Sequence, residues 1–169
     1  LPGVGSRARL GQVVAGSLAD GLEVRLDPGV SVEEMAVGRY VVVEGRLRRF
    51  FGMVTDVKLS TSNPQLSLTP PDISDPFVAA VLDGTTTFGS LAVTPMLTIG
   101  KDETSDIERP LPVKTVPSHF SHVGEANEED VNTVFGAEDE NHFFIGHPLD
   151  MDTRVCLDLS RFCARSSGV

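Results

Sequence analysis

Four histidines are the main candidates for metal ligands in this sequence. His119 and His122 form one close pair, and His142 and His147 form a second. A metal centre needs three or four converging ligands, and neither pair has the His-Glu-x-x-His spacing of a helical zinc site or two cysteines beside it. We therefore predict that these histidines make ordinary hydrogen bonds in loops and that the chain has no metal ligands.

A serine or cysteine nucleophile would have to lie beside a histidine that an acid orients. Ser118 and Ser121 flank His119, but neighbours in sequence need not converge in space, and no Gly-x-Ser-x-Gly turn is present. Cys156 lies in an apolar strand pattern beside Leu157, so we expect it in the core. These patterns indicate no catalytic residue, and a hydrolase that uses the histidines is the weakest of the functional hypotheses.

Two further features of the sequence bear on catalysis. Asp150 and Asp152 would add metal ligands or form an acid/base pair, but carboxylates at this spacing more often cap or solvate a turn. The sequence contains no Gly-x-x-x-x-Gly-Lys-Ser/Thr, the loop that holds the β- and γ-phosphates of ATP. We predict that this chain is not an enzyme and binds no cofactor itself.

One basic cluster stands out, at Arg46, Arg48 and Arg49. Charged side chains on an edge strand protect it from pairing with other molecules, and this structural interpretation is favoured. The functional alternative is a contact with another subunit or with DNA phosphates around a ring pore. These three arginines are the candidate interface or phosphate contacts of the chain.

The composition describes the scaffold that must position these residues. The chain has 169 residues, 40% of them hydrophobic, with 11 prolines, 16 glycines and no tryptophan, which is typical of one domain with many turns and few long helices. Of the net charge of −10, residues 1–60 hold 8 basic and 7 acidic side chains, and residues 61–169 hold 6 and 17. Such acidity repels a phosphate backbone, which favours a protein partner over direct DNA binding.

Short strands bounded by glycine dominate the first third of the chain. Residues 11–16, 22–26, 40–45 and 50–57 are rich in β-branched and aromatic residues with turns between them, and they predict a small barrel. Residues 88–99 alternate and are expected to pair with the barrel or extend it, with Pro95 at an edge or bulge. The expected organisation is a flexible lead-in at 1–9, a barrel at 10–99 with a connector at 60–76, and an acidic, loop-rich α+β extension at 100–169.

Three short segments have helical signals. The spacing of Ser31 and Glu34 predicts a capping box with one helical turn after it. Residues 77–82 are apolar and fit either a strand or a short helix. Residues 127–135 predict a helix that Asn127 caps and Gly136 ends, with valine and phenylalanine on its apolar face.

The order of the barrel motifs carries a family resemblance. The motifs are Gly-Gln-Val-Val-Ala-Gly at 11–16, Leu-Glu-Val-Arg-Leu at 22–26, Val-Val-Val-Glu at 41–44 and Phe-Gly-Met-Val-Thr-Asp-Val at 51–57. Their sequence resembles the HAS barrel, the N-terminal domain of HerA-like hexameric ATPases, which is related to the N-terminal barrel of rotary ATP synthase subunits. The resemblance continues through Asp75-Pro76-Phe77 and through residues 117–121 and 144–151.

This resemblance implies a non-catalytic assembly and docking domain. In that family the barrels form a collar on a hexameric DNA translocase of DNA repair, often beside a NurA-type nuclease. The parent protein would bind ATP and Mg in a domain after residue 169, and DNA would be reached only through the full assembly. Two cysteines, Cys156 and Cys163, are too few for a disulfide scaffold, so we expect a reducing compartment and a cytoplasmic protein, or an organellar one if a targeting peptide is removed. No apolar run approaches the roughly 20 residues of a membrane span.

A second hypothesis of a different class stays open. The chain would then be a freestanding small-barrel interaction module, either structural or oligonucleotide-binding, within a larger complex. Oligonucleotide-binding barrels interleave aromatic stacking residues with basic ones on one face. Phe50 and Phe51 beside Arg48 and Arg49 are a small local match to that pattern.

Overall fold

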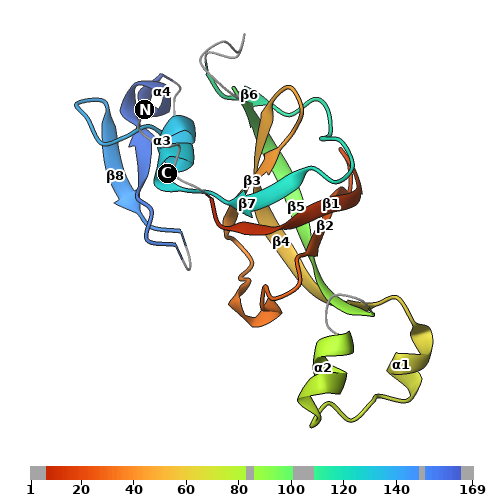
Figure 1. The fold of residues 1–169 in the computed structure, drawn as a ribbon. Helices are drawn as coiled ribbons and strands as arrows, with labels where there is room; N and C mark the ends of the chain where they lie inside the picture. Colours follow the sequence, from red (N-terminus) through yellow and green to blue (C-terminus); the bar gives the residue numbers. More distant parts are fainter. Residues whose placement is uncertain (1–6, 83–85, 101–108, 149–150, 165–169) are drawn as a thin grey trace, which may run out of the picture.

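The computed structural model describes residues 7–82, 86–100, 109–148 and 151–164. Its strands are β1 (Arg9–Ser17), β2 (Gly21–Leu26), β3 (Tyr40–Glu44), β4 (Arg49–Thr61), β5 (Thr87–Ile99), β6 (Leu111–Pro112), β7 (His122–Glu125), β8 (His142–Gly146) and β9 (Val155–Asp158). Its helices are the 3₁₀ helix η1 (Val32–Glu34) and the α-helices α1 (Pro64–Leu68), α2 (Pro76–Leu82), α3 (Glu128–Phe135) and α4 (Leu159–Cys163). Figure 1 shows a central barrel, with α1 and α2 projecting from one end and α3, α4, β8 and β9 beside it.

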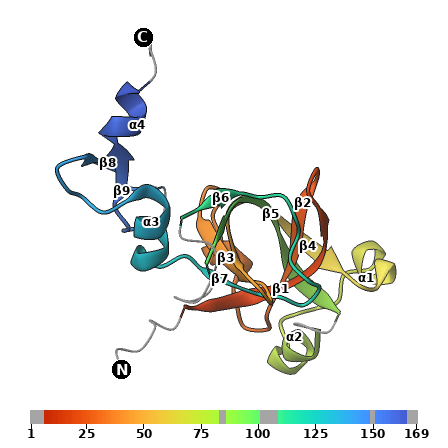
Figure 2. The ribbon, with the colours of Figure 1, turned by 90° about the horizontal axis from the view of Figure 1, so that it is seen from above.

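Six strands close into a barrel. They follow one another in the order β2, β1, β7, β3, β4 and β5, and β5 pairs back onto β2. Every neighbouring pair is antiparallel. The ring of strands is seen most clearly in Figure 2. The prediction of a mainly β chain with a small closed barrel is confirmed, and β1 to β4 are its four predicted glycine-bounded strands.

The barrel takes its sixth strand from beyond residue 99, the expected end of the barrel. β7 lies between β1 and β3, with His122 opposite Gln12 on one side and opposite Glu44 on the other. Without β7 the facing backbone groups of β1 and β3 would have no strand partner, and buried backbone groups need one. The segment expected to be a loop-rich extension therefore also completes the barrel.

Two hydrophobic clusters lie on opposite faces of β3 and β4. Val41, Val43 and Phe50 point into the barrel, where thirteen buried residues fill the interior. Val42 and Phe51 point outward and pack beneath α3 with Val131 and other apolar side chains. Because alternate strand residues face opposite sides, covering both faces allows an unbroken run of valines.

A bulge bends the long β4–β5 pair near Pro95. The register shifts between Phe51 and Gly52, and Gly52 faces Pro95. A Cβ on Gly52 would lie only 2.7 Å from the backbone oxygen of Thr94, so the two strands approach too closely there for any side chain. This confirms the predicted bulge, since proline cannot donate a ladder hydrogen bond.

The β4–β5 hairpin extends beyond the barrel. β2 pairs with β5 only from Ser90 to Val93, whereas β4 and β5 remain paired as far as Thr61 and Thr87. The hairpin ends in α1 and α2, so residues 60–76 contain the end of β4 and a helix rather than a plain connector, and residues 77–82 are helical. We call residues 59–82 and 86–89 the arm.

The remaining helices partly follow the sequence signals. Asn127 caps α3 in a capping box and Gly136 ends it with φ 83°, as predicted. At η1 the Ser31 side chain accepts from the amide of Glu33, one residue earlier than the predicted capping box requires. Cys156 of β9 is buried, as expected. Nowhere in the described segments is there a helix that combines the length and apolar character needed to cross a membrane.

Candidate interaction surfaces

The turn between β3 and β4 carries two of the three predicted arginines. Arg46 is exposed, Arg48 is partly exposed, and Leu47 between them is 79% exposed. Gly45 allows this tight turn, because a Cβ there would lie 2.5 Å from the carbonyl oxygen of Arg48. We call residues 46–48 the arginine turn. Within the described residues, neither of its arginines makes an ion pair.

Arg49, the third predicted arginine, points elsewhere. Its Nε donates to the carbonyl oxygen of Gly100 at 2.9 Å, and its Nη1 lies 3.3 Å from Oδ1 of Asp130. Only 21% of its side chain is exposed. Arg49 therefore joins β4 to α3 and is not presented beside Arg46 and Arg48 for a partner.

Asp130 is a buried carboxylate that the sequence alone did not single out. Only 2% of Asp130 is exposed. Its carboxylate accepts two hydrogen bonds from Arg7, at 2.7 and 2.5 Å, and Arg7 also donates to Glu44 at 2.7 Å. Its other hydrogen bonds close the α3 capping box with Asn127. A buried charge needs this degree of pairing to be tolerated. We call Arg7, Glu44, Arg49 and Asp130 the ion cluster.

The ion cluster fixes the position of the chain before β1. Arg7 falls in the expected flexible lead-in, of which residues 1–6 lie outside the described part of the chain. The hydrogen bond to Asp130 raises the pKa of Arg7, and burial opposes this. The signal available in the sequence was the Asn127-x-x-Asp130 spacing, which predicts a cap but not two arginines 81 and 123 positions away.

The residues considered for catalysis or metal binding do not converge. The ring of His119 lies against Phe120. His142 lies between Asp139, at 2.9 Å, and Asp158, at 3.8 Å, and His147 contacts the backbone of Thr153. In the described ranges no group of three or more His, Cys, Asp or Glu side chains has a metal-binding arrangement, and Asp150 lies outside them.

The histidine–aspartate contact in the β8–β9 region supports the local fold. Asp139 accepts from the backbone amides of Asn141 and His142 and contacts the His142 ring. The hydrogen bond from the His142 side chain, with the two amides, lowers the pKa of Asp139. Asp158 caps α4 through the amide of Arg161. These contacts hold the loop before β8 against the start of α4.

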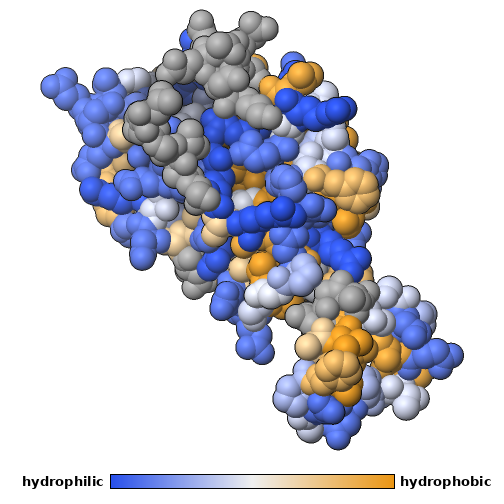
Figure 3. Space-filling model, in the orientation of Figure 1, coloured by the Kyte–Doolittle hydropathy of each residue, from blue (hydrophilic) through white to orange (hydrophobic). Residues whose placement is uncertain are grey.

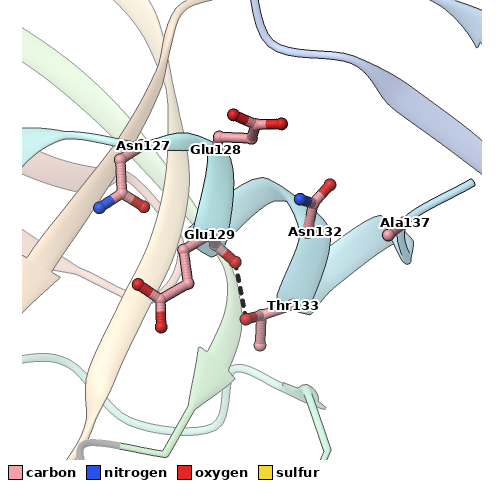
Figure 4. A pocket seen from close by; sticks show the side chains of 6 residues that line it. All are labelled: Asn127, Glu128, Glu129, Asn132, Thr133 and Ala137. Carbon is pink, nitrogen blue, oxygen red and sulfur yellow. Dashed lines mark hydrogen bonds between the residues drawn. The ribbon is translucent and has the colours of Figure 1, made fainter. Parts of the chain in front are cut away.

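An open hollow of about 660 Å³ lies on the outer side of α3. Figure 4 shows its six lining residues, with Glu128 and Glu129 pointing to different sides of the helix and Thr133 bonded to the carbonyl oxygen of Glu129. Besides its two carboxylates, the hollow is lined by two asparagine side chains, one threonine and one alanine. Its chemistry is that of a hydrated helix surface.

The arm carries a hollow with a mainly apolar lining. This arm groove has a volume of about 560 Å³ and is lined mainly by apolar side chains. They include Leu59, Leu66, Pro70, Ile73, Leu82 and Phe88. In Figure 3 the orange, hydrophobic surface of the arm is visible at the lower right. A surface of this kind is typical of a protein contact.

Comparison with known proteins gives one family. The model of the HAS barrel domain matches residues 10–101. The matched segment carries β1 to β5, and β7 follows it along the chain. No curated protein matches the chain.

Proposed function

The chain belongs to the HAS barrel domain family, and on this premise we propose that it is a non-catalytic assembly and partner-docking domain of a HerA-like hexameric ATPase that translocates DNA. The observation that carries the proposal is the family match over a barrel that closes on itself. HAS barrels are small modules that often occur in larger assemblies. The parent protein would bind ATP and Mg²⁺ outside this chain.

The barrel interior supports a role in contacts rather than in chemistry. It is filled by side chains such as Val24, Val41 and Val54, each 0% exposed. Small barrels packed in this way have no room for a ligand inside. The surfaces with recognisable binding character, the arginine turn and the arm groove, both lie outside the barrel.

The oligonucleotide-binding alternative is less favoured. Base stacking needs exposed aromatic rings beside basic side chains. Phe50 is 3% exposed and Phe51 is 0% exposed, so neither ring is available to a base. Arg49 is held in the ion cluster, which leaves Arg46 and Arg48 as the only members of the predicted basic cluster that face solvent.

The parent assembly would be a homo-hexamer in the cytoplasm, or in an organelle after removal of a targeting peptide. Its protein partner would be a nuclease of the NurA type, and DNA would be contacted by the ring as a whole. The acidic balance of residues 61–169 supports a protein partner for this chain.

The test is an ATPase assay with Mg²⁺ on the protein isolated from its own cells, beside the 169-residue chain expressed alone. We expect hydrolysis by the isolated protein and none by the chain, because the phosphate-binding loop is absent from the sequence. Hydrolysis by the chain alone, or no hydrolysis by the isolated protein, would contradict the proposal.

A further inference from the structure

The arm exposes apolar side chains that no other described element of the chain covers. Neither α1 nor α2 contains a buried residue. Leu68 is 77% exposed, Ile73 68% and Phe77 75%. Small helices are normally stabilised by burying an apolar face, so a helical pair of this kind is suited to burying it against another molecule.

The charge on the arm indicates the character of that molecule. The described residues of the arm include Asp72 and Asp75 and no lysine or arginine. Asp72 and Asp75 are exposed next to the groove residue Ile73. Two cations lie near the barrel end of the groove. Arg25 is stacked 4.0 Å over the ring of Phe88, and the Nζ of Lys58 lies 3.5 Å from Oδ2 of Asp56. An apolar segment flanked by positive charges complements this surface.

The chain itself contains such a segment. Leu47 is 79% exposed at the tip of the arginine turn and has Arg46 and Arg48 on either side. The groove volume of about 560 Å³ is several times that of a leucine side chain, so it can admit the tip of the turn. Leucine would enter the groove while the two arginines face the aspartates at its rim.

We propose that the arginine turn of one copy docks into the arm groove of a second copy. The turn precedes Arg49, and the arm begins at Leu59 near the other end of β4, so the two surfaces lie at opposite ends of this strand (Figure 1). One copy can therefore use both at once. Such a contact joins two different surfaces head to tail, and it gives a ring when the rotation between copies closes. This inference rests on the proposed function, because it names the surfaces through which copies meet.

The experiment compares two single variants of the 169-residue chain, which contains the whole closed barrel, by sedimentation equilibrium. Leu47→Asp removes the apolar side chain at the tip of the arginine turn, and Ile73→Asp places a charge in the arm groove. Each substitution replaces a mostly exposed side chain. Each variant alone should associate at least about tenfold more weakly than the unaltered chain. Mixed together they should form a two-copy complex that grows no further, since one intact turn and one intact groove remain.

The control is Leu18→Asp, at a position that is also exposed, at 52%, but lies outside both surfaces. It should associate like the unaltered chain. An unaltered chain that stays a single copy, single variants that keep its association, or a mixture that stays single copies would each overturn the inference. In each of these three cases, ATP hydrolysis by the parent protein would still support the proposed function, so the two can fail separately.

A DNA titration tests the alternative that the arginine turn binds DNA phosphates. If Arg46→Glu with Arg48→Glu weakens binding to DNA and leaves the association between copies unchanged, the turn contacts phosphates and the inference is overturned. We expect the reverse, weaker association of copies with DNA binding unchanged, because the arginines would face Asp72 and Asp75 of a neighbour.

Discussion

Asp130 of α3 and Arg7, which precedes β1, are joined by two side-chain hydrogen bonds although 123 positions separate them in the chain. Arg49 of β4 contacts the same carboxylate. One buried anion thus ties the start of the chain, the barrel wall and the helix that covers it. The barrel and α3 are held in one arrangement by a charge as well as by the cluster beneath α3.

Asp130→Asn removes this charge and keeps the side chain's shape. Two arginines lose their anion, so we expect the free energy of unfolding to fall by about 2–3 kcal/mol, less than for a fully buried pair because both arginines can reach water. Urea unfolding followed by circular dichroism measures this. Glu128→Gln, at an exposed position of α3, is the control, and an equal loss in both variants would contradict the role of the ion cluster.

Arg49 and Arg46 should differ in how much they contribute to stability. Arg49→Ala loses its bonds to Gly100 and Asp130 and should lower the unfolding free energy by about 1–2 kcal/mol. Arg46→Ala, at an exposed turn, should change it by less than about 0.5 kcal/mol. The same urea unfolding measures both, and equal effects would show that the distinction between the two sites is wrong.

Core and arm phenylalanines should also differ. Phe51 is 0% exposed and its ring lies 5.0 Å from that of Tyr40, so Phe51→Ala should cost about 3–5 kcal/mol of stability. Phe77 of the arm is 75% exposed, and Phe77→Ala should cost less than about 0.5 kcal/mol. Thermal unfolding of both variants tests this, and a large loss in Phe77→Ala would mean that α2 belongs to the folded core.

The acid titration of Asp139 reports the β8–β9 region. Its pKa is lowered in the folded chain, first by the hydrogen bond with His142. A lowered folded-state pKa favours the folded state above the unfolded value, and that contribution is lost as the pH falls through the folded value. His142→Ala should raise the Asp139 pKa toward its ordinary value, which carboxyl carbon shifts in NMR would follow. Asp72, whose pKa is lowered by Ser74, should be unchanged. An unmoved Asp139 would rule out the His142 contact.

The sequence predicted the parts of the fold that depend on local pattern. Glycine spacing and β-branched residues located β1 to β4, and Asn127 with Gly136 located α3. β7 was not predicted, because His-Val-Gly-Glu is too short to show an alternating pattern and its position depends on pairing with β1 and β3. α1 was not predicted, because its Pro-Gln-Leu-Ser-Leu sequence lies among turn residues.

The candidate surfaces were predictable only in part. The basic cluster was visible in the sequence, but the separation of Arg49 from Arg46 depends on where α3 places Asp130. Burial of that carboxylate is a tertiary property, since its partners Arg7 and Arg49 come from distant segments. The arm groove likewise arises from the folding of α1 and α2 against the end of the β4–β5 hairpin.

The mass of the assembled protein tests the central claim most directly. Native mass spectrometry of the protein isolated from its own cells should give six copies in one complex, because the proposed function assigns this barrel to a hexameric ring. A mass equal to a single copy under the same conditions would contradict the proposal that this barrel is an assembly domain.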